Sequence, residues 1–226
     1  MTSLISSRPT ADPQPFSAQD VAARASQRLS LTLDEDALNP TTVPSWGDHV
    51  LSPDLFPADI ELASRPAAVL VPIVAREGKA TVLLTRRAAH LRNHAGQIAF
   101  PGGKIDETDA SPVEAALREA SEEIGLNARL ITPLGYLDPW LTGTGFRVIP
   151  VVALVDNTLA LTLNPDEVDD VFEVPVEFLM EPMNHLIHQR DHAGKARQFY
   201  AMPYGERYIW GATAGILRNL YVRLYG

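Results

Sequence analysis

The sequence predicts an α/β protein in which a β-sheet is sandwiched between helices. Two nearly continuous apolar runs, residues 67–75 and 146–155, are typical of buried strands. Two amphipathic patterns at helical spacing, residues 112–124 and 206–225, supply helices that can cover such a sheet. No internal repeat and no second domain is evident along the chain. We therefore expect one α/β domain.

The N-terminal segment is expected to be an extension of this domain. Residues 1–15 are rich in Ser, Pro and Thr, which is typical of a disordered tail. Residues 17–29 predict a short helix, because Ser17 can cap it and apolar side chains recur on one face. Four prolines within residues 31–61 indicate an irregular surface segment. The predicted organisation is a tail followed by a single domain (16–226), whose extension runs to about residue 64.

The sheet is expected to begin with a hairpin. Strand 67–75, a turn at 77–79 and a returning strand at 80–85 follow one another directly. Residues 86–95 then form a basic loop or a short helical turn. A short strand at 97–100 leads into a Gly-Gly turn, which places two flexible residues before the next helix.

The helix at 112–124 has signals at both ends. Ser111 can cap it, Pro112 suits its first position, and Glu114 completes a capping box with Ser111. Gly125 is a typical C-terminal residue for a helix. The apolar face of this helix consists of Val113, Ala116, Leu117, Ala120 and Ile124.

The remaining elements follow from the same patterns. In chain order, we expect a strand at 129–137, a loop at 138–145, the buried strand at 146–155, a strand at 172–175 that passes into a short helix at 176–180, a hairpin of 185–188 with 198–202, and a final helix at 206–225. Gly211 and Gly215 have a G-x-x-x-G spacing in that final helix. Two arrangements fit it, namely close packing inside the monomer and self-association into a homodimer.

Composition excludes several classes of protein. The 226 residues include no cysteine, so disulfides, thiolate metal sites and cysteine nucleophiles are excluded. The net charge of −9 argues against nucleic-acid binding, which usually needs a basic face. No apolar run is long enough to span a membrane, and the N-terminal residues lack the basic segment and apolar run expected of a signal peptide. We expect a cytoplasmic protein with no nucleic-acid and no membrane partner.

Three glutamates indicate a metal site. Glu119, Glu122 and Glu123 stand at i, i+3 and i+4 of the predicted helix, where like charges repel. They also lie near the helix C-terminus, where the helix dipole disfavours carboxylates. A cation would compensate both effects, and Mg²⁺ or Mn²⁺ suits an all-oxygen ligand set. The alternative is a solvated acidic face with no ligand.

Gly103 together with residues 118–126 (REASEEIGL) resembles the Nudix box of the Nudix hydrolases, G-x5-E-x7-R-E-U-x-E-E-x-G-U, in which U is a bulky aliphatic residue. The resemblance implies the α/β/α Nudix fold with a mixed sheet. It also implies metal-dependent hydrolysis of a pyrophosphate bond. The first half of the box departs from the pattern, because an aspartate stands in place of its first glutamate. Three acids are therefore candidate partners of Arg118, namely Asp106, Glu107 and Asp109.

The segment just before the box carries a second motif. Residues 83–103 (LLTRRAAHLRNHAGQIAFPGG) resemble the L-L-T-x-R-S-x3-R-x3-G-x3-F-P-G-G signature of the coenzyme A pyrophosphatase subgroup of that family. Ala88, where the signature has Ser, is the one mismatch. The resemblance to this subgroup extends over roughly residues 65–220. It implies a substrate that contains the pyrophosphate of coenzyme A.

The resemblance assigns roles to the residues of the box. Glu119 and Glu123 correspond to metal ligands, and Glu122 to a further ligand or the catalytic base. The backbone carbonyl of Gly103 corresponds to an additional ligand. Arg118 would pair with an acid of the preceding loop, with Asp109 as our choice, and orient the glutamates.

Other residues are candidates for substrate binding and for the base. Arg87 and Arg92 can contact phosphates, since arginine binds them bidentately, although both could simply pair with the acidic helix. Gly102 is assigned to substrate binding beside them. An acidic cluster at 166–173 is expected to be a solvated loop, and Glu167 within it is the alternative candidate for the base. His90 and His94 at i, i+4 are a weak zinc pair, because no third nitrogen ligand is evident.

The sequence thus predicts a Mg²⁺- or Mn²⁺-dependent enzyme that hydrolyses coenzyme A or acyl-coenzyme A to 3′,5′-ADP and a 4′-phosphopantetheine. One alternative keeps the chemistry but changes the small-molecule substrate to another nucleoside diphosphate derivative, such as ADP-ribose, NADH or a nucleoside triphosphate. An alternative of another class is a non-catalytic Nudix-fold regulator that binds nucleotides.

Overall fold

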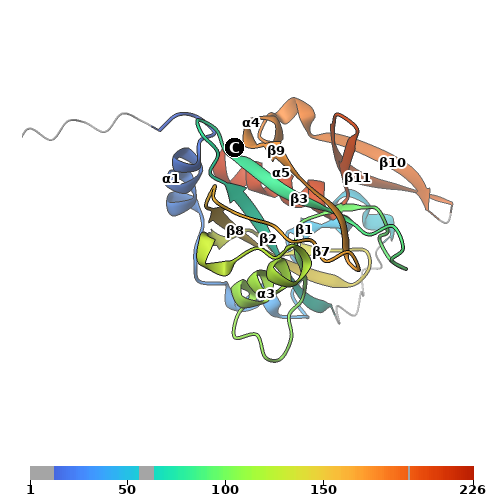
Figure 1. Ribbon diagram of the computed structural model, residues 1–226. Helices are drawn as coiled ribbons and strands as arrows, with labels where there is room; N and C mark the ends of the chain where they lie inside the picture. Colours follow the sequence, from blue (N-terminus) through green and yellow to red (C-terminus); the bar gives the residue numbers. More distant parts are fainter. Residues whose placement is uncertain (1–12, 56–63, 193) are drawn as a thin grey trace, which may run out of the picture.

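The centre of the fold is a pair of long parallel strands (Figure 1). The computed structural model describes residues 13–55, 64–192 and 194–226, so most of the tail expected at 1–15 lies outside it. Strands β2 (Arg65–Val74) and β8 (Phe146–Val155) pair along ten residues. Both were predicted from their apolar runs, and most of their side chains are buried.

The main sheet is built outward from this pair. Strand β3 (Thr81–Arg87) pairs with the end of β2 at Ile73–Val82. Further along the same edge it pairs with the short strand β4 (Ile98–Ala99). Its other edge pairs along its length with β9 (Val168–Pro175). Strand β5 pairs with β2, so the short β4–β5 segment fills the space between β2 and β3. The strands that complete this sheet are β3 (Thr81–Arg87), β4 (Ile98–Ala99), β5 (Gly102–Lys104) and β9 (Val168–Pro175) on one side of β2, and β6 (Ile131–Tyr136), β7 (Trp140–Leu141) and β1 (Trp46–Gly47) on the side of β8.

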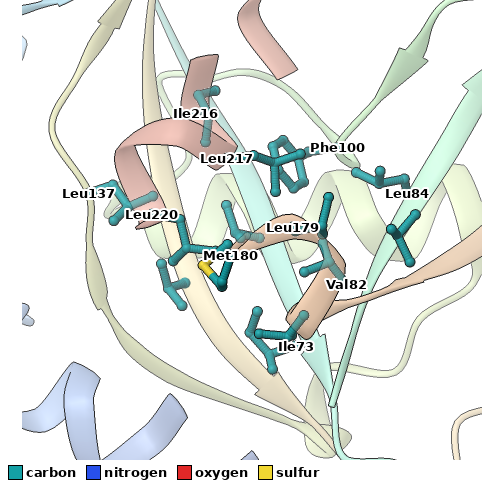
Figure 2. Close-up of a cluster of buried hydrophobic side chains, with 14 of the residues drawn as sticks. Ile73, Val82, Leu84, Phe100, Leu137, Leu179, Met180, Ile216, Leu217 and Leu220 are labelled. Carbon is teal, nitrogen blue, oxygen red and sulfur yellow. The ribbon is translucent and has the colours of Figure 1, made fainter. Parts of the chain in front are cut away.

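Helices cover both faces of the sheet, which confirms the predicted α/β/α layers. Helix α3 (Pro112–Ile124) packs on one face. Helix α5 (Ala212–Leu224) packs on the other, and Figure 2 shows its Leu217 and Leu220 gathered with sheet residues such as Val82 in one apolar cluster. The other helices are α1 (Ala18–Arg28), α2 (Asp48–Leu51) and α4 (Val176–Leu179). Within the described ranges, no helix is long and apolar enough to cross a membrane.

The ends of α3 follow the sequence signals, with one difference. Ser111 Oγ accepts a hydrogen bond from the N–H of Glu114 at 3.2 Å, and Gly125 ends the helix with a φ of 66°. The carboxylate of Glu114, however, accepts from the N–H of Ala110 at 2.9 Å. The capping box was predicted to close on the N–H of Ser111, so the return contact falls one residue earlier.

The C-terminal region differs most from the predicted secondary structure. The helix predicted from residue 206 begins only at Ala212, because Arg207–Trp210 form strand β12. Gly211 separates the two elements with a φ of 66°, and in the strand Ile209 is buried while Tyr208 is exposed. Strand β12 adds to the predicted hairpin, which is confirmed and longer than expected: β10 (Leu186–His192) and β11 (Lys195–Tyr204).

Three further boundaries differ from the prediction. Strand β9 begins at Val168 rather than 172, so much of the expected acidic loop is strand. Two of its acids are neutralised there, because Arg207 lies 2.7 Å from Asp170 and Arg76 pairs with Glu173. The short strand β7 lies inside the predicted loop 138–145, and β6 begins at Ile131 rather than 129, after a 3₁₀ turn.

The glycine spacing in α5 has a packing explanation. A Cβ on Gly215 would lie 2.0 Å from Trp140 Cη2, so only glycine lets the helix approach this indole. Gly211 is the N-cap of the helix and meets no such neighbour. Close packing inside the monomer therefore accounts for Gly215.

The N-terminal extension is held to the domain by a buried arginine. Arg147, at the start of β8, is 1% exposed and donates to the carbonyls of Ala37 and Thr42 and to the hydroxyl of Ser64. Burial lowers its pKa. Trp46 packs on Trp140 nearby, with ring centroids 6.5 Å apart. The extension therefore completes the edge of the main sheet.

Candidate active site

The Gly-Gly turn brings the backbone of β5 against the glutamates of α3. Gly102 has a φ of 153°, and a Cβ there would lie 2.4 Å from the carbonyl oxygen of Ala68 in β2. A Cβ on Gly103 would lie 2.4 Å from Oε1 of Glu119. Only glycine allows both approaches, so the turn sets how closely the backbone meets the carboxylate of Glu119.

The three glutamates of α3 lie in different environments. The side chain of Glu122 is 54% exposed, that of Glu119 is 17% exposed and that of Glu123 is only 4% exposed. Burial raises the pKa of Glu119, although the neighbouring Arg118 opposes the increase. The spacing in α3 places the three on one face, and the burial of Glu123 shows that part of this face turns into the protein.

Glu123 combines a buried side chain with a strongly raised pKa. Burial raises its pKa to about 7, against the opposing effects of a hydrogen bond from the N–H of Gly102 at 3.2 Å and of Arg87. The Nη1 of Arg87 lies 3.9 Å from Oε1 of Glu123. The Nε of Arg87 is buried and has no hydrogen-bond partner among the described residues. This arginine therefore retains donor capacity beside the buried carboxylate.

Asp109, the partner expected for Arg118 among the three candidate acids, is the one that binds it most closely. Asp109 accepts two hydrogen bonds from it, at 3.1 Å from Nε and 3.0 Å from Nη2, and this contact lowers the pKa of the Asp109 carboxyl. Asp106 lies further away, at 3.6 Å, and no ion pair with Glu107 is present in the described part of the chain. The Nη1 of the same guanidinium contacts Glu119 at 3.0 Å and Glu122 at 3.1 Å.

Glu167 lies at the edge of this group. Its charge contributes to the raised pKa of both Glu119 and Glu123, so the three carboxylates are neighbours in space. The side-chain amide of Asn164 donates to Oε1 of Glu167 at 3.1 Å, and the backbone N–H of Asn164 donates to the carbonyl of Glu123. Asn164 was not among the residues predicted for the site. Its spacing of three residues from Glu167 was the available signal.

The structure does not bring every candidate to the carboxylates. Arg92 is exposed in the loop between β3 and β4, and no ion pair involves it within the described residues. His90 and His94 are exposed in the same loop, and His94 contacts Gln97 at 2.9 Å. Among the residues that the structure describes, these two histidines belong to no group of three His, Asp or Glu side chains that could hold a metal ion.

The donor set suits a divalent cation, although the side chains have other partners here. In the ranges that the structure describes, no three His, Asp or Glu side chains surround a common point. Glu119 and Glu122 contact Arg118, and Glu123 accepts from Gly102. Glu119 and Glu123 are both desolvated and have raised pKa values, and the glycine turn brings backbone close to Glu119. Such a set of oxygen donors still fits an oxygen-preferring ion such as Mg²⁺.

Comparisons with known proteins show the family to which this chain belongs. A solved NUDIX hydrolase from Alicyclobacillus acidocaldarius has a TM-score of 0.46 and 20% identity, over 71% of this chain and 92% of that one. A Yersinia enterocolitica protein named "Uncharacterized Nudix hydrolase NudL" is 42% identical over 164 residues, which cover 73% of this chain and 84% of that protein. A Cronobacter sakazakii protein of the same name is 45% identical over 166 residues, with coverages of 72% and 84%. The NUDIX domain family model matches residues 64–198. From this match and the two relatives, the chain belongs to the Nudix hydrolase family.

Proposed function

We propose that this protein is a divalent-metal-dependent hydrolase that cleaves the pyrophosphate bond of coenzyme A or an acyl-coenzyme A. The observation that carries the chemistry is the buried carboxylate of Glu123, which lies beside Glu119, the Gly-Gly turn and Arg87. The coenzyme A preference is supported by the 83–103 signature, whose residues run from β3 through β4 to Gly103.

In this proposal Glu119 and Glu123, with the carbonyl of Gly103, would hold Mg²⁺ or Mn²⁺, and Glu122 would be a further ligand. The ion would supply charge neutralisation at the pyrophosphate oxygens. Arg87, whose side chain is 30% exposed beside Glu123, would bind a phosphate, and Arg92 would contact the substrate from the exposed loop. Asp109 fixes Arg118, which in turn holds two of the glutamates.

The general base remains a choice between Glu122 and Glu167, and the contacts favour Glu167. Glu122 is paired with Arg118, whereas Glu167 has an amide partner and no ion pair in the described part of the chain. Its backbone carbonyl accepts from the N–H of Ala88, and Asn164 links its loop to the end of α3. Glu167 is therefore oriented next to the carboxylates while its side chain stays partly accessible to water.

Glu167→Gln is expected to lower kcat by roughly 10²–10⁴-fold, the contribution typical of a general base. The affinity for Mn²⁺, measured by titration calorimetry, should change little, because Glu167 is not assigned as a ligand. Asp166→Asn is the matched control, since it removes the same charge from the neighbouring exposed position. Wild-type kcat in Glu167→Gln would exclude this residue as the base.

The substrate assignment is tested by comparing kcat/KM for coenzyme A, ADP-ribose, NADH and a nucleoside triphosphate with Mg²⁺ or Mn²⁺. We expect coenzyme A to be preferred, because the 83–103 signature belongs to that subgroup. Preference for another substrate would retain the metal chemistry and reject the signature as a guide to specificity. Nucleotide binding without turnover of any substrate would favour a non-catalytic regulator.

A further inference from the structure

The guanidinium of Arg118 makes two separate sets of contacts, one through Nε and Nη2 and the other through Nη1. Its Nε and Nη2 are bound by both oxygens of Asp109, and Nη2 also donates to the carbonyl of Lys104 at 3.1 Å. Its Nη1 is shared between Glu119 at 3.0 Å and Glu122 at 3.1 Å. One guanidinium therefore joins the loop before α3 to two of the three box glutamates.

The two sets of contacts are expected to differ in strength. The Asp109 side chain is only 6% exposed, and it binds Arg118 bidentately, which is the strong form of this pair. The Glu122 side chain is 54% exposed, and an exposed ion pair of this kind contributes little. The contacts with Asp109 therefore hold the guanidinium in place. A competing cation could replace Nη1 as the partner of Glu119 and Glu122.

We propose that Arg118 is an internal counter-ion, which neutralises Glu119 and Glu122 before the metal binds and which the metal must displace from Nη1. This inference rests on the proposed metal site. It explains how three glutamates at i, i+3 and i+4 can share one face of α3 before a cation binds, since the guanidinium offsets their mutual repulsion. Asp109 keeps Arg118 in place while Nη1 loses its contacts.

The counter-ion role and a purely orienting role predict opposite effects on metal affinity. If Arg118 only orients the glutamates, then its removal disorders the ligands and weakens metal binding. If Arg118 neutralises the glutamates by pairing with them, then its removal frees the ligands and strengthens metal binding. The direction of the change therefore separates the two roles, and neither requires a measurement of turnover.

The experiment is a calorimetric titration of Mn²⁺ into the full-length wild type and into Arg118→Gln, Lys104→Gln and Glu123→Gln. Arg118→Gln is expected to lower the Kd for Mn²⁺ roughly tenfold, because two partly exposed ion pairs no longer compete. Lys104→Gln removes the same charge from an exposed side chain without a glutamate contact, so its Kd should stay within about twofold of wild type. Glu123→Gln should abolish binding.

Unchanged or weaker binding in Arg118→Gln overturns the counter-ion role and leaves the metal site intact. Equal strengthening in Lys104→Gln also overturns it, because net charge would then explain the effect. Absence of Glu123-dependent Mn²⁺ binding in wild type rejects the proposed metal site together with this inference. If Arg118→Gln does not fold because Asp109 is left unpaired, then Arg118→Gln/Asp109→Asn removes both charges, and it should show the same tenfold strengthening.

Discussion

Glu123→Gln is expected to abolish hydrolysis and, at the same time, to stabilise the metal-free protein at alkaline pH. The loss of kcat/KM should be roughly a thousandfold or more, because a ligand of the proposed catalytic ion is removed. Glutamine is nearly isosteric and can still accept the hydrogen bond from the N–H of Gly102. The variant therefore removes the charge and retains the packing.

The pH dependence of this stabilisation follows from the pKa of Glu123. Burial raises that pKa from 4.5 to about 7 in the folded protein, so folding favours the protonated form. The stability that this provides is fully present below pH 4.5 and is lost as pH rises through 7. At pH 8 the wild type must bury a charge that the variant lacks. The variant should then be more stable by roughly 3 kcal/mol, with no gain at pH 4.5.

Urea unfolding in EDTA at pH 4.5 and pH 8 measures this difference. Glu122→Gln is the matched control, since it removes the same charge from the exposed position one residue earlier, and its stability should change by less than about 1 kcal/mol. Added Mg²⁺ should reverse the order at pH 8 by stabilising only the wild type. Equal stability of wild type and Glu123→Gln at pH 8 would show that the buried carboxylate is already compensated.

Alanine at the two glycines of the turn is expected to change different properties, namely stability at Gly102 and activity at Gly103. Gly102→Ala places a Cβ 2.4 Å from the carbonyl of Ala68 and 2.6 Å from Cα of Val69, both backbone atoms of a central strand, at a φ of 153°. Backbone cannot move aside easily, so the free energy of unfolding should fall by roughly 2–4 kcal/mol.

Gly103→Ala should instead affect activity. Its Cβ would meet the carboxylate of Glu119, with Oε1 at 2.4 Å and Cδ at 2.5 Å, which is the movable end of a side chain. The protein should stay folded within about 1 kcal/mol of wild type, because the carboxylate can rotate away. Misplacing a proposed ligand should lower kcat/KM by roughly a hundredfold.

Urea unfolding and kcat/KM, measured on both alanine variants, separate these outcomes. Gly78→Ala, in an exposed turn at a φ of 77° where a Cβ meets nothing within 4 Å, is the control for alanine at a positive φ without a clash, and it should cost only about 1 kcal/mol. Wild-type activity in Gly103→Ala would contradict the placement of Glu119 against the turn.

Much of the fold could be predicted because its signals are local. The ends of α3 are set by Ser111, Pro112 and Gly125, which act on their own turn of the helix. The two parallel strands were visible as apolar runs, since strands buried on both faces need no polar side chains. The start of α5 was not predicted, because Ile209 suits a helix stripe and a strand equally well, and only pairing with β11 selects the strand.

For the site, the sequence by itself determined the candidate residues: the three glutamates of α3, Arg118 and the Gly-Gly turn. Only the tertiary structure decided how they differ. Glu122 and Glu123 are adjacent and identical in chemistry, yet one is exposed to solvent and the other is buried against Gly102. The same holds for Arg118, whose choice of Asp109 depends on how the preceding loop folds back. The physical reason is that desolvation and ion pairing depend on neighbours distant along the chain, and helical spacing alone does not specify them.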